Sequence, residues 1–332
     1  MRGSATLSPL MRLRWIKWTG LVLAALLAIL VFGVAPFWLA GMVTARRYEF
    51  PDRENAGLTP ASFDLPFEEV AFNAPDGPRL SGWWVPNTAG RGTVVLVHGL
   101  NRSRVEMVRK VPFLHQAGWN ALLFDLRHHG KSEGTVSSFG RFEKDDVRAA
   151  TAYALARARG PVVLWGVSLG AASAALAAAD DPEVGGLVCD SSYRSLRDTV
   201  RHHVRLFRGF AWWLRAVPPW PVSEEVVFWI GRRAGFDPDS VDVKAAAGRL
   251  AGRPALFVCN SGDRRMPQAI AFELQAAAGE KARVLVVPGN SHGGAWRDGR
   301  AAYEAAVAML LEDVSRERGV ALTAQGQGGI ER

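Results

Sequence analysis

Short apolar runs alternate with longer amphipathic stretches along most of this chain. Thr93–Val97 and Val162–Trp165 are wholly apolar, which is typical of strands buried on both faces of a parallel sheet. Longer stretches such as Arg300–Arg316 carry apolar residues three and four positions apart, a spacing that predicts an amphipathic helix. Strands alternating with helices predict an α/β domain with a mainly parallel, doubly wound sheet and helices on both faces.

The same pattern predicts the individual elements. The expected strands are Glu68–Asn73, Arg79–Pro86, Thr93–Val97, Ala121–Asp125, Val162–Trp165, Gly186–Cys189, Ala255–Cys259 and Val284–Val287. The expected helices are Ser103–Ala117, Phe142–Arg159, Leu169–Ala179, Pro267–Ala278 and Arg300–Arg316. The first two strands are expected to form a hairpin that turns at Pro75–Pro78.

One region interrupts the alternation of strands and helices. Between Tyr193 and about Leu250 the chain is rich in aromatic residues and arginine, and Val217–Pro221 divides it. We expect a helical insertion over about residues 194–250 that lies over the edge of the sheet as a cap. Ordinary packing of aromatic side chains against the sheet would explain the same composition.

The N-terminal part of the chain is a candidate membrane helix. No residue from Trp18 to Ala45 is charged, and about 20 apolar residues in a helix suffice to cross a bilayer. A cleaved signal peptide is the main alternative, although its apolar region is usually shorter; Val43–Ala45 would serve as a cleavage site. A buried core helix is a third possibility, which the flanking charges disfavour. We expect a retained single-pass anchor over residues 1–47.

The charge distribution supports a membrane rather than a nucleic acid as partner. Of 40 basic residues, six lie in Met1–Arg47, which has no acidic residue, so 34 basic residues face 32 acidic ones elsewhere. Four basic residues precede the apolar stretch and two follow it, which favours an extracytoplasmic domain. A linker over 48–62, a folded domain over 63–316 and a disordered tail over 317–332 complete the expected organisation.

Cysteine and metal chemistry are not indicated by the sequence. Cys189 and Cys259 fall inside apolar runs and are expected to be two buried thiols rather than a disulfide. Neither has a second cysteine or a histidine at metal-ligand spacing, so we expect no metal site. The chain also lacks G-x-G-x-x-G after its first parallel strand, which argues against a dinucleotide cofactor.

The best candidate for chemistry is Ser168, the centre of Gly166–Gly170, which fits G-x-S-x-G. The pentapeptide directly follows an apolar strand and directly precedes a helix, the context in which a serine is exposed on a sharp turn. Glycine lets the neighbouring backbone come close, and the helix N-terminus favours developing negative charge. A chance glycine-serine turn is the alternative.

A serine hydroxyl needs a base and an orienting acid. Among the seven histidines, His292 lies in a loop just after the last expected strand, where such sheets place their sites. Asp263 follows the strand before it and is the favoured acid. Asp190 also ends a strand and is the alternative acid, although it could simply accept nearby backbone N–H groups.

The reaction would also need donors for an oxyanion. His98 and Gly99 end the strand Thr93–Val97 in a tight turn that would aim the N–H of Leu100 into the site. Leu169, the residue after the serine, would supply the second N–H. The same His-Gly pair could instead be no more than a strand-ending turn.

Together these motifs resemble the α/β-hydrolase superfamily over about residues 63–316. The matching pieces include His98-Gly99, the stretch Asp125–Ser132 of the form Asp-x-Arg-x-x-Gly-x-Ser, and the Ser168 turn. Cys189–Tyr193 and Asp263-x-x-x-Pro267 look like the branch of peptidases and esterases related to prolyl oligopeptidases. The resemblance implies an acyl-enzyme mechanism without metal or organic cofactor. The chain lacks the His-Gly-Gly-Gly motif of many lipases and has no room between Arg47 and Phe63 for a propeller.

The resulting expectation is a serine hydrolase of ester, thioester or amide bonds. The aromatic, arginine-rich insertion favours a lipid-like or other small apolar acyl substrate. Peptide hydrolysis and acyl transfer could use the same residues. A membrane-tethered binding protein without turnover is the alternative of a different class.

Overall fold

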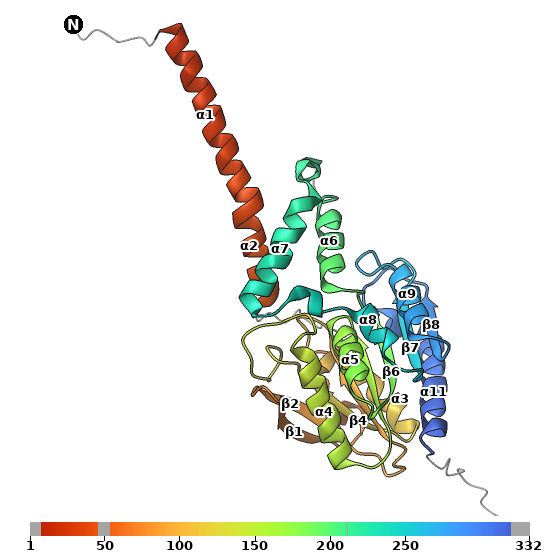
Figure 1. Cartoon of the computed structure of the whole chain (residues 1–332). Helices are drawn as coiled ribbons and strands as arrows, with labels where there is room; N and C mark the ends of the chain where they lie inside the picture. The colour runs from red at the N-terminus through yellow and green to blue at the C-terminus, as the bar shows by residue number, and fades with distance from the viewer. Residues whose placement is uncertain (1–7, 46–53, 211, 320–332) are drawn as a thin grey trace, which may run out of the picture.

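Eight strands form one mixed sheet at the centre of the molecule (Figure 1). The computed structural model describes residues 8–45, 54–210 and 212–319. The expected tail over 317–332 therefore lies largely outside the described residues, as does the first part of the expected linker over 48–62. The predicted α/β fold with a mainly parallel sheet is confirmed.

The order of the strands across the sheet is β1-β2-β4-β3-β5-β6-β7-β8. Their bounds are β1 Glu68–Asn73, β2 Arg79–Val85, β3 Thr93–Val97, β4 Asn120–Phe124, β5 Val162–Val167, β6 Val184–Asp190, β7 Ala255–Asn260 and β8 Ala282–Val287. Strands β1 and β2 form the predicted hairpin, and β2 pairs antiparallel with β4. All other pairs are parallel, so the carboxyl ends of β3 to β8 lie at one edge of the sheet.

Helices cover both faces of the sheet because alternate strand residues point to opposite sides. Val95 and Val97 of β3 face a core formed with α4 (Glu143–Arg157), α5 (Leu169–Asp180), α8 (Val243–Gly248) and α9 (Ala269–Ala278). Val94 and Leu96 face the opposite core, formed with η3 (Arg104–Lys110), α3 (Val111–Gln116), α10 (Ala295–Asp298) and α11 (Arg300–Glu317). Cys189 and Cys259 are both buried free thiols, as predicted.

One predicted helix has a different form. The expected single helix Ser103–Ala117 is a 3-10 helix, η3, followed by the short α-helix α3. Pro112 stands in the first turn of α3, where its missing N–H costs nothing. Because proline cannot donate to a preceding carbonyl, the α-helix begins there rather than at Ser103.

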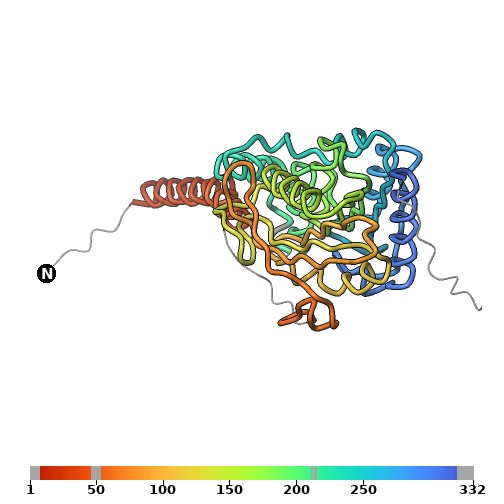
Figure 2. The backbone as a smooth tube through the Cα atoms, turned by 90° about the horizontal axis from the view of Figure 1, so that it is seen from below, coloured from red at the N-terminus to blue at the C-terminus, as the bar shows by residue number. Residues whose placement is uncertain are grey.

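The N-terminal helix projects away from the body of the domain (Figures 1 and 2). It comprises α1 (Pro9–Ile29), a π-helical turn, η1 (Leu30–Val34), and α2 (Ala35–Thr44). The π-helical turn directly precedes α2, whose second residue, Pro36, has no N–H to donate to the helical ladder. Of the described residues, only this helix is long and apolar enough to cross a membrane, and it is almost entirely exposed. It could be an anchor or a signal sequence.

Between β6 and β7 lies the segment that the sequence analysis expected as an insertion. It contains α6 (Leu196–Phe207), η4 (Trp212–Ala216), α7 (Pro219–Ala234), η5 (Pro238–Ser240) and α8. Helices α6 and α7 form a hairpin whose tip points in the same direction as α1 (Figure 1). The lower half of α7 packs against α2, where Pro36, Ala40 and Thr44 are buried.

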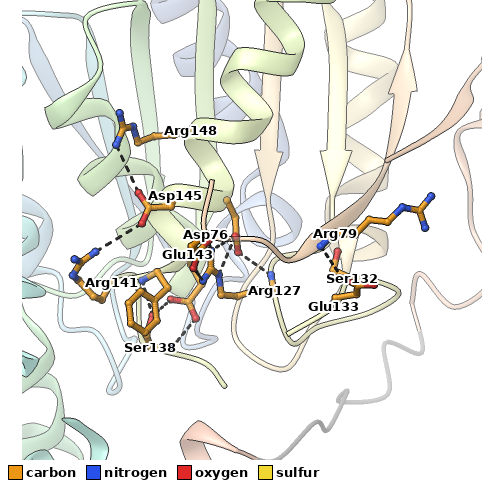
Figure 3. Close-up of polar contacts among 12 residues, drawn as sticks. Asp76, Arg79, Arg127, Ser132, Glu133, Ser138, Arg141, Glu143, Asp145 and Arg148 are labelled. Atoms are coloured by element: carbon orange, nitrogen blue, oxygen red, sulfur yellow. Dashed lines mark hydrogen bonds and ion pairs between the residues drawn. The ribbon is translucent and has the colours of Figure 1, made fainter. Parts of the chain in front are cut away.

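The stretch Asp125–Ser132 forms a buried polar network after β4 (Figure 3). The guanidinium of Arg127 donates to Asp146 at 2.7 and 2.9 Å and to Asp76 at 2.5 and 2.8 Å. Glu143 accepts bonds from Ser138 and its neighbours, which fixes the loop before α4. These residues join the β1–β2 hairpin, β4 and α4. The stretch Asp125–Ser132 therefore has a structural role in this chain.

Candidate active site

Ser168 lies at the turn between β5 and α5, at the carboxyl edge of the sheet. Its φ of 54° and ψ of −114° are strained for a residue other than glycine. A Cβ on Gly166 would come within 2.3 Å of the Gly170 backbone, and one on Gly170 within 2.3 Å of the Val97 carbonyl oxygen. The turn can therefore close only with glycine at both positions, and it leaves the hydroxyl of Ser168 partly exposed.

His292 and Asp263 lie beside this serine. His292 Nε2 is 2.8 Å from Ser168 Oγ, and His292 Nδ1 is 2.8 Å from Asp263 Oδ2. The side chain of His292 is 12% exposed and that of Asp263 only 1%. The structure thus brings together the three residues that the sequence proposed as nucleophile, base and acid.

Backbone contacts hold the two loops in register. Gly262 N–H donates to the Gly289 carbonyl at 2.8 Å, which ties the Asp263 loop to the His292 loop. Gly289 has a φ of 157°, and a Cβ there would lie 2.3 Å from the side-chain nitrogen Nδ2 of Asn260. Asp298 of α10 accepts from both Asn260 and Ser291 at 2.7 Å. These contacts therefore fix the loop that carries the imidazole of His292.

The electrostatics favour an ionised Asp263. Burial by itself would raise the pKa of this carboxyl. The hydrogen bond and charge of His292, with the N–H groups of Met266 and Arg265, outweigh burial and lower the pKa of Asp263 below its ordinary value. Because Oδ1 accepts the two backbone bonds, Oδ2 is directed at the imidazole. An ionised acceptor at Nδ1 keeps the proton there and leaves Nε2 to act as a base toward Ser168.

Asp190, the alternative acid, belongs to a different network. Its Oδ2 accepts from the Tyr303 hydroxyl at 3.0 Å, and its Oδ1 accepts from Ser191 Oγ at 2.9 Å. Ser191 Oγ in turn accepts from the Gly293 N–H at 3.2 Å. Burial raises the pKa of Asp190, with partial compensation from Ser191. Asp190 therefore braces the residue after His292 instead of contacting the imidazole.

The loop after β3 lies against the serine. A Cβ built on Gly99 would be 3.6 Å from Ser168 Cβ. In the described part of the chain, the N–H groups of Leu100 and Leu169 have no hydrogen-bond partner. Both proposed oxyanion donors are therefore free to bind an incoming oxygen.

Two side chains that the sequence analysis did not assign to the site hold this loop. Glu106 Oε2 accepts from the Gly99 N–H at 2.7 Å. His98 is fully buried, accepts from the Leu126 N–H at Nε2 and bonds the Gly99 carbonyl through Nδ1. Burial and the nearby His129 lower the pKa of His98, so it is neutral and structural. No sequence signal marks Glu106, because its partner is a backbone group seven residues away.

Helix α6 borders the site. His202 Nε2 bonds the carbonyl of Arg264, next to Asp263, at 2.7 Å. Burial lowers the pKa of His203, and its hydrogen bond to the Thr199 carbonyl partly offsets this. The α6–α7 hairpin therefore rises from the rim of the site. Among the described residues there is no group of three His, Cys, Asp or Glu side chains that could hold a metal ion.

Comparisons with known proteins identify the family of the chain. A family model described as serine aminopeptidase, S33, matches residues 88–236, which include Ser168 but end before Asp263 and His292. The uncharacterized protein Rv2307c of Mycobacterium tuberculosis is 30% identical over 302 residues, covering 88% of this chain and 95% of that protein. The chain belongs to the α/β-hydrolase family.

Two further matches cover most of the chain at lower identity. The uncharacterized protein YqkD of Bacillus subtilis is 24% identical over 256 residues, covering 75% of this chain and 81% of its own. The structure of the Pyrococcus furiosus esterase Pf2001 superposes with a TM-score of 0.64 at 22% identity, covering 81% of this chain and 97% of the esterase. At that identity the structural match supports the fold and leaves the substrate to be argued from the site.

Proposed function

We propose that this hydrolase is a serine esterase that acts on an apolar acyl substrate and is held at a membrane by its N-terminal helix. The observation that carries the proposal is the hydrogen-bonded series Ser168–His292–Asp263, with both bonds at 2.8 Å, at a strained turn. A strained serine that contacts an imidazole oriented by a buried carboxylate is the arrangement that activates a hydroxyl for attack.

The proposed reaction proceeds through an acyl-enzyme. Ser168 Oγ attacks the carbonyl carbon of the ester while His292 Nε2 takes the hydroxyl proton. The N–H groups of Leu100 and Leu169 bind the oxyanion of the tetrahedral intermediate. Collapse of the intermediate breaks the carbon–oxygen bond, and His292 returns the proton to the departing alcohol. Water then attacks the acyl-enzyme with His292 again as base, and Ser168 is released.

An apolar acyl group is favoured by the surroundings of the site. The hairpin that rises from its rim is rich in arginine and aromatic residues, and arginine suits an anionic head group. Thioester or amide hydrolysis, including peptide cleavage, and transfer of the acyl group to another acceptor remain compatible with the same residues. A tethered binding protein without turnover would have no use for a serine that is hydrogen-bonded to an oriented imidazole. The arrangement of Ser168, His292 and Asp263 therefore favours an enzyme.

Anchoring belongs to the same proposal. The helix Pro9–Thr44 has basic residues before its apolar stretch, including Arg12, Arg14 and Lys17, which favours an inside N-terminus. The catalytic domain would then lie outside the cytoplasm. Immunoblotting of membrane fractions with tags at either end, with and without protease, tests both retention and orientation.

The enzymatic proposal is tested by labelling with a fluorophosphonate probe. The full chain in detergent is compared with Ser168→Ala and with the matched control Ser240→Ala, an exposed serine on η5 that contacts none of the three proposed catalytic residues. Labelling is expected for the wild type and Ser240→Ala and absent for Ser168→Ala. A series of p-nitrophenyl esters of increasing chain length then reports the acyl preference. A folded wild type that neither labels nor hydrolyses any ester would favour the tethered binding protein.

A further inference from the structure

The tip of the α6–α7 hairpin exposes an unusual number of large aromatic side chains. Phe210 is 80% exposed, Trp212 82% and Trp220 73%, and Phe207 at the end of α6 is 54% exposed. Single exposed apolar residues need no explanation, but a cluster at one protruding tip marks a surface that is covered by an apolar partner.

The hairpin rises beside the N-terminal helix, touches it at α2 and leans away from it toward the tip (Figure 1). The rings of Phe37 and Trp229 meet edge to face with centroids 5.0 Å apart, and Arg233 lies 4.7 Å over the Phe37 ring. Four residues further along α2, Gly41 faces the same Arg233, so the two helices run in the same direction. Figure 1 shows the tip rising beside the lower part of the N-terminal helix.

This packing sets the height of the tip along the apolar helix. Eight residues of helix separate Trp229 from Pro221, a rise of ~12 Å. Because α7 leans away from α2, its start lies level with a residue between Ile29 and Phe37, inside the uncharged stretch from Trp18 to Ala45. If α1 and α2 cross a bilayer with Trp38 at the outer interface, the aromatic tip lies deeper in the bilayer than the indole of Trp38.

The charged residues of the hairpin fit the same position. Glu224 is neutralised by Arg197 and Arg201 between the two helices. Arg205 and Arg215 are exposed near the tip and form no ion pair within the described part of the chain. Long arginine side chains can extend to lipid phosphates while neighbouring aromatic rings sit among the acyl chains.

We propose that the α6–α7 hairpin inserts its aromatic tip into the leaflet that the N-terminal helix crosses, so that the catalytic site receives its substrate from the bilayer. The route is short, because the four residues from Phe207 to His203 rise only ~6 Å and α6 contacts the Asp263 loop. The substrate class that follows is an ester with a long acyl chain already partitioned into the membrane. The substrate class rests on the proposed esterase function, whereas the insertion of the tip does not.

Insertion is tested by spin labels on the full chain in phosphatidylcholine–phosphatidylglycerol nanodiscs. Phe210→Cys and Trp212→Cys are compared with Phe272→Cys and Met309→Cys, exposed apolar positions at 49% and 56% on the body of the domain. The two native cysteines are buried, and the unsubstituted chain gives the labelling background. Labels at the tip are expected to be relaxed by oxygen and protected from a water-soluble nickel complex, with the reverse at Phe272 and Met309. Tip labels as accessible to nickel as the control labels would overturn the insertion.

Substrate delivery is tested separately with Phe210→Asp and Trp220→Asp. Hydrolysis of a long-chain ester embedded in vesicles is expected to fall about tenfold, since each aromatic ring loses its burial in lipid. Fluorophosphonate labelling and hydrolysis of a dissolved short ester should stay within about twofold, which shows an intact site. Equal losses on both esters would overturn delivery from the bilayer. Inserted labels in a protein that hydrolyses nothing would leave the insertion standing and refute the esterase function instead.

Discussion

Replacement of Asp263 by asparagine is the sharpest test of the proposed chemistry. Asp263 Oδ2 lies 2.8 Å from His292 Nδ1, and its side chain is almost fully buried. Asparagine has the same shape, and its carbonyl oxygen can still accept from the N–H groups of Arg265 and Met266. The amide NH₂ is then directed at Nδ1, which must become an acceptor. The imidazole proton moves to Nε2, where it faces Ser168 and cannot take the hydroxyl proton.

The expected loss follows from this exchange of tautomers. An intact but wrongly protonated histidine typically lowers kcat by about 10⁴-fold, which corresponds to ~5.4 kcal/mol of transition-state stabilisation. KM for a short p-nitrophenyl ester should change little, because Asp263 is shielded from the substrate by His292. The assay is steady-state hydrolysis at neutral pH, with circular dichroism to verify folding.

Asp190→Asn is the matched control for this prediction. Asparagine at this position can still accept from Tyr303 or Ser191, so kcat should stay within about tenfold of the wild type. A folded Asp263→Asn variant that retains activity within tenfold, beside an Asp190→Asn variant that loses 10³-fold or more, would refute the assignment of the acid.

Three further predictions concern the surroundings of the site. Glu106→Ala should lower kcat about tenfold with KM unchanged, because the Gly99 N–H loses a charged acceptor worth about 1–3 kcal/mol; an equal change in KM would contradict a positioning role. Arg127→Leu should lower the free energy of unfolding by about 3–5 kcal/mol, since Asp146 is left buried and unpaired, and a loss below 1 kcal/mol in urea titrations would contradict this. Because the pKa of Asp263 is lowered in the folded protein, its ionised form stabilises the fold above the ordinary value of 3.8, and this contribution is lost as the pH falls through the folded pKa. The difference in Tm between wild type and Asp263→Asn should therefore shrink as the pH falls below about 4; a difference that is unchanged between pH 5 and pH 2 would refute the lowered pKa.

The strands were the most predictable part of the fold. Glu68–Asn73 and Thr93–Val97 were predicted with both ends correct, and the other predicted strands match observed ones within two residues. Strands buried on both faces are apolar at nearly every position, so a short continuous apolar run in the sequence predicts them. The helix expected over Ser103–Ala117 was wrong in form, because apolar spacing does not distinguish a 3-10 helix from an α-helix when a proline restarts the backbone.

The candidate site was predictable to the extent that it depends on local structure. Ser168 was assigned from a strand, a glycine-flanked turn and a helix, all within a few residues. The choice between Asp263 and Asp190 could only be a preference, because both follow adjacent parallel strands whose carboxyl ends meet at one edge. In the folded chain, Asp263 contacts His292 while Asp190 contacts Tyr303 of α11, more than a hundred residues away.

The sequence by itself therefore determined the alternation of strands and helices, the position of the glycine-flanked serine and the uncharged N-terminal stretch. Each depends on residues that are neighbours along the chain. Only the tertiary structure decided which carboxylate faces the imidazole, that Glu106 holds the loop after β3, and that α7 runs beside α2. Those contacts join residues far apart in the sequence, and their geometry depends on how loops close and helices dock, which no local pattern of apolar and polar positions encodes.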